Sequence, residues 1–430
     1  MASPIGMLGP TALPPQSRKV GLEAELQIKS VPQSIYTALK GLYNAKKQNM
    51  PNGIYMKVNE TALRSAYRGR ITLLERLSGA GVMGGRQAIG EEEQPSTKVA
   101  EIYHNNCRKV VSVPGYGTEK LHAEYLSLFE KFIDQLADWN REQEDLEIHQ
   151  ALLETFGDTL LHGETAAAAD PLDPSQPGGG PCAPNWNPNV FVAGIGAHGN
   201  QPAYSQNSAA YSQNIVNALN TVASGAGTFL NTDVLGNLSN YALNKRIEPL
   251  DLPGTPSGKG YVLTISELQA MYLGDPAWSA KNLGSLFIQK AALPDTVMSW
   301  PGVLGMFKDL VFVVDHRIPT VTRVGSTGLS AGYMKHGNND ERNRDMSTGD
   351  AFDVAILHGK GAVVKWEPEP LKSIKQDDDY EKIKGVGTAC VRGIQLPLYW
   401  ENIDNKQPTD TPEQFTSAVV LCAMPGEVSP

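Results

Sequence analysis

Residues 119–156 read EKLHAEYLSLFEKFIDQLADWNREQEDLEIHQALLETF. Ten large apolar side chains recur in this stretch at helical spacing and form one broad face: Leu121, Tyr125, Leu128, Phe129, Phe132, Leu136, Trp139, Leu146, Leu153 and Phe156. Thr118 suits the helix N-cap, and Glu119 suits the first turn. At a rise of about 1.5 Å per residue, an unbroken helix of this length would be roughly 57 Å long. The stretch therefore predicts one very long amphipathic helix.

The same stretch is acidic, with ten Asp and Glu against three Lys and Arg. Two interpretations stay open: a solvated helix face, or an acidic rail that receives a basic segment of a neighbouring copy. Residues 1–70 are basic, with ten Lys and Arg, three Glu and no Asp, whereas the whole chain has a net charge of −9. Opposite charges on identical copies favour self-association, so this pattern predicts a self-assembling structural subunit rather than an enzyme.

The bulk composition is that of an ordinary globular protein. The chain has 430 residues, of which 41% are hydrophobic, so it is long enough for two or three domains. It has no continuous apolar run of membrane-spanning length, and its start lacks the charged and apolar regions of a signal peptide. The four cysteines form no CxxC pair: Cys107, Cys182, Cys390 and Cys422. We expect free thiols in a reducing cytoplasm, not a disulfide scaffold or a zinc site.

Before the acidic helix, the pattern changes several times. Residues 33–48 predict a short amphipathic basic helix, because apolar side chains recur at helical spacing with lysines off that stripe. Residues 79–90 contain five glycines, which rules out a regular helix there. Residues 99–113 alternate like a strand. We expect a long, mobile, hairpin-like excursion over about 70–115.

Beyond the acidic helix, the Pro- and Gly-rich residues 164–188 predict a domain boundary. Residues 215–245 predict a helix, and Ser266 with Gln269 matches a capping box that opens a short helix. Residues after 402 predict a polar tail. The remaining apolar runs predict strands at 260–265, 309–315, 351–366 and 385–398.

Two glycine motifs resemble phosphate-binding loops but lack the context that such loops need. Gly194–Gly199 matches GxGxxG, yet Asn200-Gln201-Pro202 follows where a helix must open toward the phosphate, so we favour a loop. Gly254–Gly260 is one residue short between its glycines, and a glycine follows its lysine, so we favour a turn that enters a strand.

A third motif, Gly328–Gly332, matches GxSxG with Ser330 in the nucleophile position. A nucleophile elbow needs a helix after it, but a polar, loop-like stretch follows. His336 and His358 lie downstream. A serine hydrolase centred on Ser330 therefore remains only an alternative.

Other chemistry-bearing residues form no recognisable site. The eight histidines form no HxH or HExxH motif, and we expect His122 and His149 on the helix surface or at a helix contact. Residues 377–379 are three aspartates without the spacing of a calcium loop, which predicts a solvated turn. We therefore expect no catalytic residue, no cofactor and no metal site.

The basic N-terminal arm offers a second alternative, a single-stranded nucleic-acid-binding protein. Positive charge attracts phosphates, and aromatic rings stack on bases. Four tyrosines are available for this role: Tyr36, Tyr43, Tyr55 and Tyr67. No recognised nucleic-acid-reading module accompanies them, so contact with a neighbouring copy is the preferred interpretation.

The order of these segments resembles the major capsid proteins of tailed bacteriophages, specifically the coliphage N-four-type coat protein family. The resemblance covers roughly residues 60–400 and rests on three stretches: Leu77–Val82 with the Gly90–Glu93 turn and the long helix; Tyr261–Leu273 with Trp278 and Gly302–Pro319; and Ala351–Trp366 with the strand at 385–398. It implies an α+β fold of the Hong Kong 97 capsid type.

The resemblance also implies a division of the chain: a 1–65 N-arm, a 66–115 E-loop region, a 116–165 spine helix of the peripheral domain, a 166–189 linker loop, a 190–350 axial domain, 351–400 return strands of the peripheral domain and a 401–430 C-terminal tail.

The function implied by the resemblance is that of a major capsid protein, a structural virion protein without enzymatic activity. It would self-assemble into pentamers and hexamers of an icosahedral phage head that encloses double-stranded DNA without sequence specificity. Further implied partners are scaffold, portal and decoration or cement proteins. The resemblance implies no association with a membrane. The protein would be made in the host bacterial cytoplasm and reside in the virion.

Overall fold

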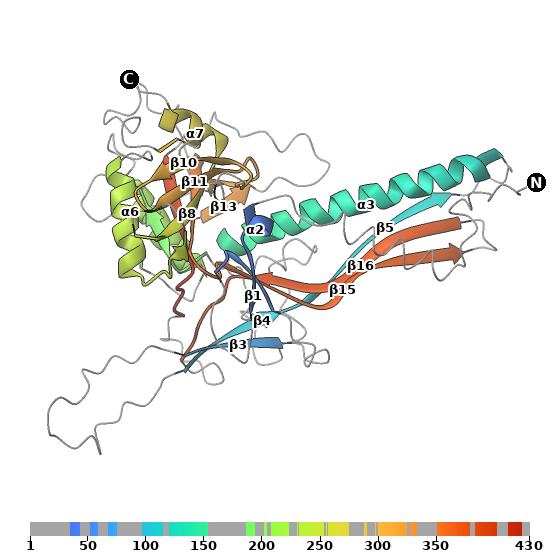
Figure 1. The fold of residues 1–430 in the computed structure, drawn as a ribbon, viewed down its shortest axis with the longest axis horizontal. Helices are drawn as coiled ribbons and strands as arrows, with labels where there is room; N and C mark the ends of the chain where they lie inside the picture. Colours follow the sequence, from blue (N-terminus) through green and yellow to red (C-terminus); the bar gives the residue numbers. More distant parts are fainter. Residues whose placement is uncertain are drawn as a thin grey trace, which may run out of the picture.

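Two β-sheets share one long helix, α3 (Lys120–Leu153), as Figure 1 shows. The computed structural model describes residues 35–43, 52–58, 68–74, 97–114, 120–153, 186–193, 202–203, 208–222, 230, 232–252, 255, 257–274, 288–289, 297, 300–324, 328–332, 351–378, 383–401 and 412–423.

The first sheet has five strands in the order β1-β2-β15-β16-β5. Their bounds are β1 (Lys40–Tyr43), β2 (Tyr55–Val58), β15 (Val363–Asp378), β16 (Ile383–Gln395) and β5 (Asn105–Pro114). The three long strands β15, β16 and β5 are antiparallel neighbours, whereas β1 and β2 pair in parallel. α3 runs along one face of the long strands (Figure 1). Leu136 and Ala137 of the helix pack there against Leu371 of β15.

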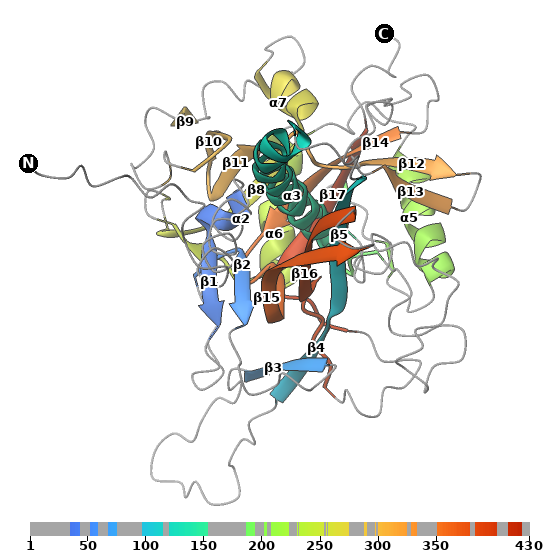
Figure 2. The same cartoon turned by 90° about the vertical axis from the view of Figure 1, so that its right-hand side faces the viewer.

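A two-stranded unit covers part of the opposite face of this sheet. It consists of β3 (Arg68–Leu74) paired antiparallel with β4 (Thr97–Tyr103), and it lies below the sheet in the end-on view of α3 (Figure 2). Ile71 and Ile102 pack against Trp366, and a Cβ at Gly69 would lie 3.2 Å from that indole ring. A hairpin-like antiparallel pair is present over 68–103, but residues 105–114, expected in the same excursion, form β5 of the five-stranded sheet. Residues 75–96 lie outside the described residues, so the mobility of the loop stays a prediction.

The second sheet has ten strands, most of them in the order β13-β12-β14-β8-β11-β10-β9. β17 pairs with both β14 and β6, and β7 pairs with β8. The bounds are β6 (Val190–Val192), β7 (Leu250–Asp251), β8 (Lys259–Ile265), β9 (Ile288–Gln289), β10 (Val303–Phe307), β11 (Leu310–Val314), β12 (Thr320–Val324), β13 (Gly328–Gly332), β14 (Ala351–His358) and β17 (Ser417–Ala423).

The central strands of this sheet are mostly apolar because both faces are covered, with buried polar exceptions such as Thr264 of β8 and Asp353 and His358 of β14. One face packs against the C-terminal end of α3, through Ile148 and Leu152, and against α5 (Ser208–Val222). The other face packs against α6 (Thr232–Asn244) and α7 (Glu267–Gly274). The last turns of α3 therefore belong to the core of the second sheet.

The described residues confirm most of the expected elements. α3 is a single helix of 34 residues, and the strands expected near 99–113, 260–265, 309–315, 351–366 and 385–398 are all present. Ser266 Oγ accepts a hydrogen bond from the Gln269 N–H at 3.2 Å, so the expected N-cap of α7 is confirmed.

Two helix predictions are wrong. The basic helix expected over 33–48 is the four-residue α2 (Ile35–Ala38), and β1 follows it at once. Pairing of β1 with β2 competes with the helix there, and Gly41 weakens a helix in any case. The helix expected over 215–245 is two helices, α5 and α6, and Gly225 and Gly227 lie in the interval between them.

The polar tail expected after residue 402 is also wrong in part. Residues 417–423 form β17, a central strand whose Ala418, Val419, Val420 and Leu421 are fully buried. The run SAVVLCA is short, and polar and proline residues flank it, so the sequence alone did not indicate a core strand there. The final part of the chain thus completes the core of the second sheet.

Leu421→Ala should lower the free energy of unfolding by about 2–5 kcal/mol, because it leaves a cavity in a fully buried strand. Leu243→Ala is the matched control, since Leu243 is 63% exposed and its truncation should change stability by less than about 0.5 kcal/mol. Urea unfolding followed by tryptophan fluorescence measures both. Equal effects would show that β17 is not part of the core.

Candidate functional site: the polar junction of the long helix

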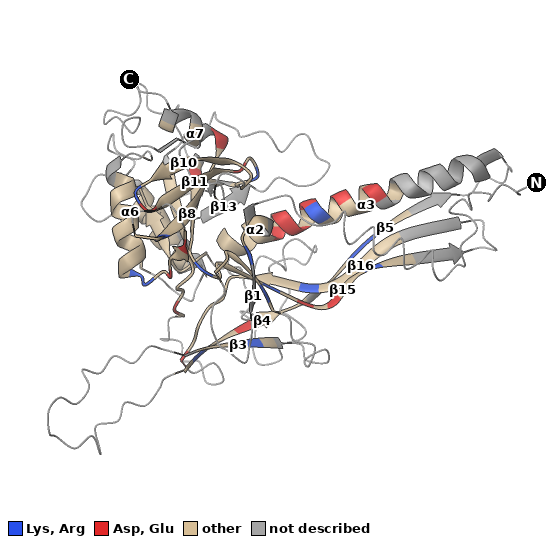
Figure 3. Ribbon diagram, in the orientation of Figure 1, with Lys and Arg blue, Asp and Glu red and all other residues tan. Residues whose placement is uncertain are grey.

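The C-terminal half of α3 carries polar side chains that contact both sheets. Residues three or four apart lie on the same side of a helix, so Asn140, Glu144 and Glu147 share one face, and Asp145 shares the adjacent face with His149. All five side chains are buried. Figure 3 shows the concentration of acidic residues on the described part of α3.

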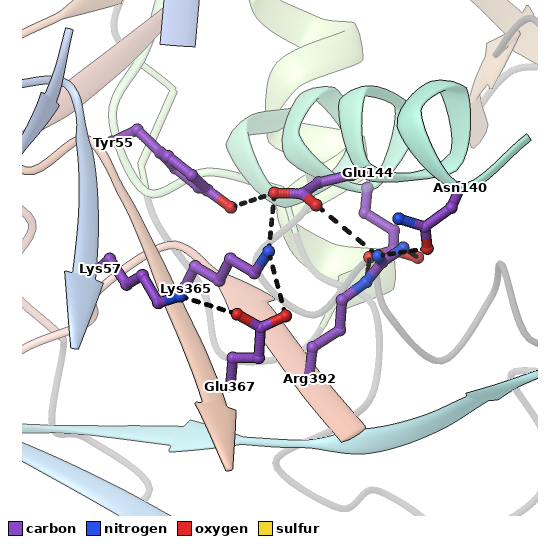
Figure 4. Close-up of polar contacts among 8 residues, drawn as sticks. Tyr55, Lys57, Asn140, Glu144, Lys365, Glu367 and Arg392 are labelled. Carbon is purple, nitrogen blue, oxygen red and sulfur yellow. Dashed lines mark hydrogen bonds and ion pairs between the residues drawn. The ribbon is translucent and has the colours of Figure 1, made fainter. Parts of the chain in front are cut away.

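Glu144 is the centre of the contact with the five-stranded sheet (Figure 4). One of its carboxylate oxygens accepts hydrogen bonds from the Tyr55 hydroxyl at 2.7 Å and from the Lys365 ammonium at 2.9 Å. Lys365 also lies 3.6 Å from Glu367, which pairs with Lys57 at 2.8 Å. The network therefore links α3 to β2 and β15.

Arg392 of β16 makes the second contact of this network. Its Nε and Nη2 donate to the two carboxylate oxygens of Glu147 at 2.8 and 2.7 Å, and its Nη1 donates to Asn140 at 3.0 Å. The guanidinium also lies 3.7 Å from Glu144. A planar guanidinium that meets a carboxylate with two parallel hydrogen bonds fixes both position and orientation.

The charges in this network hold one another ionised. Burial alone would raise the pKa of Glu144, but the Lys365 and Arg392 cations lower it to about 2. Burial would lower the pKa of Lys365, yet the carboxylates of Glu144 and Glu367 raise it. Burial and the Glu144 charge raise the pKa of Tyr55. These groups do not exchange protons near neutral pH, so the cluster fixes structure and is not an acid–base site.

A second polar cluster joins the adjacent face of α3 to the ten-stranded sheet. His149 Nε2 lies 3.2 Å from an oxygen of Asp315, and the Asp145 carboxylate pairs with Arg317. Asp315 and Arg317 follow β11 directly. Burial disfavours a charged imidazole, but the Asp315 carboxylate outweighs it and raises the pKa of His149. The Asp315 carboxylate therefore favours the protonated form of the buried imidazole.

Tyr36 of the N-terminal region packs into this second cluster. Its ring lies edge-on between the rings of His149 and His358, with centroid distances of 5.5 and 5.6 Å. Burial lowers the pKa of His358 to about 3, so this histidine is neutral, and its Nε2 contacts the Thr264 hydroxyl. The expectation that His149 lies at a helix contact is confirmed.

Neither interpretation of the acidic helix holds for its C-terminal half. Glu144, Asp145 and Glu147 are neither solvated nor open to another copy, because they pair with basic residues of the same chain. Sequence reasoning missed these partners, which lie 172 to 245 residues away along the chain and carry no local signal. Asp134 and Asp138 are exposed, so the two interpretations stay open further toward the N-terminus of α3.

The structure contradicts the local geometry required for a serine hydrolase. Gly328–Gly332 is the strand β13, in which Ser330 pairs with Thr322 of β12, so this segment is not a strand-to-helix elbow. His358 is fully buried against Thr264, and His336 lies outside the described residues.

The other motifs are turns and strands where they are described. In the described part of the Gly254–Gly260 motif, the Gly258 N–H donates to the Thr255 O at 3.0 Å and closes a turn that leads into β8, as expected; residues 254 and 256 lie outside the described residues. Asp377 and Asp378 belong to β15, so the turn expected there is wrong for these two residues. Gly194–Gly199 lies outside the described residues.

Three of the four cysteines lie among the described residues. Cys107, Cys390 and Cys422 are free and buried, and Cys182 lies outside the described residues. The described His, Cys, Asp and Glu side chains form no group suited to a metal ion. Among the described helices, none has the length and apolar character needed to cross a bilayer.

Two of the four tyrosines proposed for nucleic-acid stacking cannot serve that role in the folded chain. Tyr36 is fully buried between two histidines, and the Tyr55 hydroxyl donates to Glu144 in the core. The side chains of Tyr43 and Tyr67 lie outside the described residues. The nucleic-acid alternative loses these two base-stacking rings.

Comparison with known proteins finds no matching family model and no matching curated protein. Solved structures do match. The capsid of Ralstonia phage GP4 has a TM-score of 0.59 and 15% identity over 93% of both chains. The head structure of Helicobacter pylori bacteriophage KHP40 has a TM-score of 0.55 and 12% identity over 91% of both chains. The cyanophage Pam1 capsid has a TM-score of 0.53 and 15% identity over 92% of this chain and 93% of that one.

The chain has a phage capsid-protein fold. The α+β, Hong Kong 97-type fold implied by the resemblance is confirmed. Membership of the coliphage N-four-type family stays a prediction. In this capsid fold, the polar junction lies where the long helix meets both sheets.

Removing one partner of the Arg392 pair tests the junction. Glu147→Gln should lower the free energy of unfolding by about 3–5 kcal/mol, because it leaves a buried guanidinium without its carboxylate. The double variant Glu147→Leu/Arg392→Met should recover much of that loss. Asp138→Ala is the control: it breaks a 2.9 Å ion pair with Arg141 on the exposed part of the same helix and should cost less than about 1 kcal/mol. Equal losses in urea unfolding would contradict a structural role for the buried pair.

The His149–Asp315 pair should make stability depend on pH. Folding raises the pKa of His149. Its contribution to the free energy of unfolding is therefore complete below its unfolded pKa of about 6.5, and it is lost as pH rises through its folded pKa. As pH rises from below the unfolded pKa to above the folded pKa, the free energy of unfolding of the wild type should fall relative to that of His149→Gln. The fall should be about 1.4 kcal/mol for each unit by which folding raises the pKa of His149.

Urea midpoints of both proteins between about pH 6 and 9 measure this difference. His358→Gln is the control, because the lowered pKa of His358 makes its own contribution fall only below about pH 6.5. Parallel profiles for wild type and His149→Gln would contradict the ion pair.

Proposed function

We propose that the chain is a major capsid protein that assembles into the pentamers and hexamers of an icosahedral phage head around double-stranded DNA. The observation that carries this proposal is the match to three phage head and capsid structures over at least 91% of both chains. So complete a correspondence involves the whole subunit and not a single shared module.

The polar junction supports the proposal on mechanical grounds. A shell subunit must keep its shape while many small interfaces act on it together. The buried charges fix α3 against the five-stranded sheet through Glu144 and Glu147, and against the ten-stranded sheet through Asp145 and His149. One helix thereby holds both sheets in a fixed relation.

The division implied by the resemblance is part of the same proposal. Residues 66–115 form an E-loop region, 116–165 a spine helix, 190–350 an axial domain, and 351–400 return strands. We place the anchor of the 1–65 N-arm at residues 35–58, whose strands β1 and β2 belong to the five-stranded sheet and whose Tyr36 and Tyr55 are buried.

The charge distribution supports packaging of DNA without specific binding. The chain has a net charge of −9, and residues 71–430 carry more negative charge than the whole because the N-terminal region is basic. A negative body repels phosphates and allows packaged DNA to move along the shell wall. Scaffold, portal and decoration or cement proteins remain proposed partners, with synthesis in the host cytoplasm and residence in the virion.

Negative-stain electron microscopy of the purified chain tests the function. We expect closed shells, tubes or capsomer rings, and Ser330→Ala should assemble like the wild type, since its strand has no catalytic geometry. A chain that stays monomeric at every concentration and is labelled at Ser330 by a fluorophosphonate probe would contradict the proposal.

A truncation separates the arm from the fold. Removal of residues 1–34 spares Tyr36, β1 and β2, so the subunit should stay folded by circular dichroism and lose shells. Unchanged shells would show that these residues are dispensable for assembly.

A further inference from the structure

The register of the five-stranded sheet places two cysteines directly opposite each other. Cys107 of β5 and Cys390 of β16 are Cα partners in the antiparallel pairing of these strands. Directly opposed residues in such a pair have Cα atoms about 4.5–5.5 Å apart, within the range of about 4.4–6.8 Å that disulfides span. The backbone therefore already has the separation that a disulfide needs.

The two thiols share one buried environment. Cys107 is 2% exposed and Cys390 is 4% exposed, and both face α3 in a cluster with Leu136, Ala137 and Leu371. Apolar neighbours restrain both side chains and keep water away. The third described cysteine, Cys422, faces Asp353 across β14 and β17, so its register gives it no cysteine opposite.

The two thiols also share their electrostatic surroundings. Burial raises both pKa values, and the Arg392 guanidinium, two residues along β16 from Cys390, lowers both. Either sulfur can therefore supply the attacking thiolate, and the other completes the bond.

We propose that Cys107 and Cys390 form an oxidisable dithiol that closes to a cross-strand disulfide when it meets a disulfide oxidant such as oxidised glutathione. One of the two cysteines, as its thiolate, attacks one sulfur of glutathione disulfide and releases one glutathione thiolate, which takes the proton of the other cysteine. The thiolate of that other cysteine then attacks the mixed disulfide at the protein sulfur and expels the second glutathione as its thiolate. Two protein thiols are oxidised, and one glutathione disulfide is reduced to two thiols.

The position of β5 makes the pair reachable despite its burial. Among the described strands, β5 is the outermost of its sheet and pairs with β16 alone, and its Val110 is 56% exposed. Local opening of an edge strand exposes its inward side chains without global unfolding. The disulfide would then tie β5, which lies between β4 and α3 in the chain, to β16.

The expected consequence is a stiffer subunit under oxidising conditions. The bond closes a very long loop, which restricts the unfolded chain strongly. In a reducing cytoplasm the pair stays as thiols. A shell that leaves the cell would gain this bond in every subunit, a consequence that rests on the proposed function. The bond itself is tested on the purified chain, so its failure leaves the assembly proposal unaffected.

The test is oxidation of the purified full-length chain with glutathione disulfide, followed by denaturation in N-ethylmaleimide and peptide mapping without reductant. We expect a linked peptide pair that contains Cys107 and Cys390, reversed by dithiothreitol, while Cys422 is recovered alkylated. The double variant Cys182→Ser/Cys422→Ser should keep the link, and Cys107→Ser should lose it. Oxidation should raise the midpoint of urea unfolding of Cys182→Ser/Cys422→Ser and leave that of Cys107→Ser unchanged.

Recovery of both Cys107 and Cys390 as alkylated thiols, under conditions that oxidise Cys182, would overturn the proposal. A link from Cys107 to Cys182 or Cys422 would also overturn it. If Cys107→Ser does not fold, Cys107→Ala takes its place. The peptide map of the oxidised wild-type chain tests the proposal without any variant.

Discussion

The paired hydrogen bonds between Arg392 and Glu147 are the contact on which the placement of the long helix depends. A buried charge without its partner is costly, so α3 cannot rotate or slide by a residue without leaving several charges unpaired. Glu144 and Asp145 obey the same constraint toward Lys365 and Arg317. Apolar contacts alone would tolerate a shifted helix. The ion pairs therefore select one register of the helix against both sheets.

This constraint also explains why the two sheets act as one body. The face of α3 that carries Glu147 meets β16, and the adjacent face that carries His149 meets the segment after β11. Ile148 and Leu152 lie in the core of the ten-stranded sheet, so the helix ends inside that core. A force on either sheet is therefore transmitted to the other through this helix.

Charge counted along the sequence differs from charge displayed in space. The basic N-terminal region suggested an arm that reaches another copy. Its described part, however, packs within its own chain, where β1 and β2 belong to the five-stranded sheet. Lys57 pairs with Glu367, and Tyr36 and Tyr55 fill the core. Several acidic side chains of α3 likewise pair with basic residues of the same chain. Among the described acidic side chains of α3, Asp134 and Asp138 are exposed.

The sequence alone determined the long helix and the main strands, because helical and strand periodicities are local properties that a few residues reveal. The α+β class came from the resemblance that the order of these segments bears to phage capsid proteins. The tertiary structure alone decided which acids of α3 are buried, that residues 417–423 form a central strand, and that Cys107 faces Cys390. These facts depend on which distant segments meet. Arg392 and Glu147 lie 245 residues apart, and no local pattern encodes their encounter, which arises only when both sheets close on the helix.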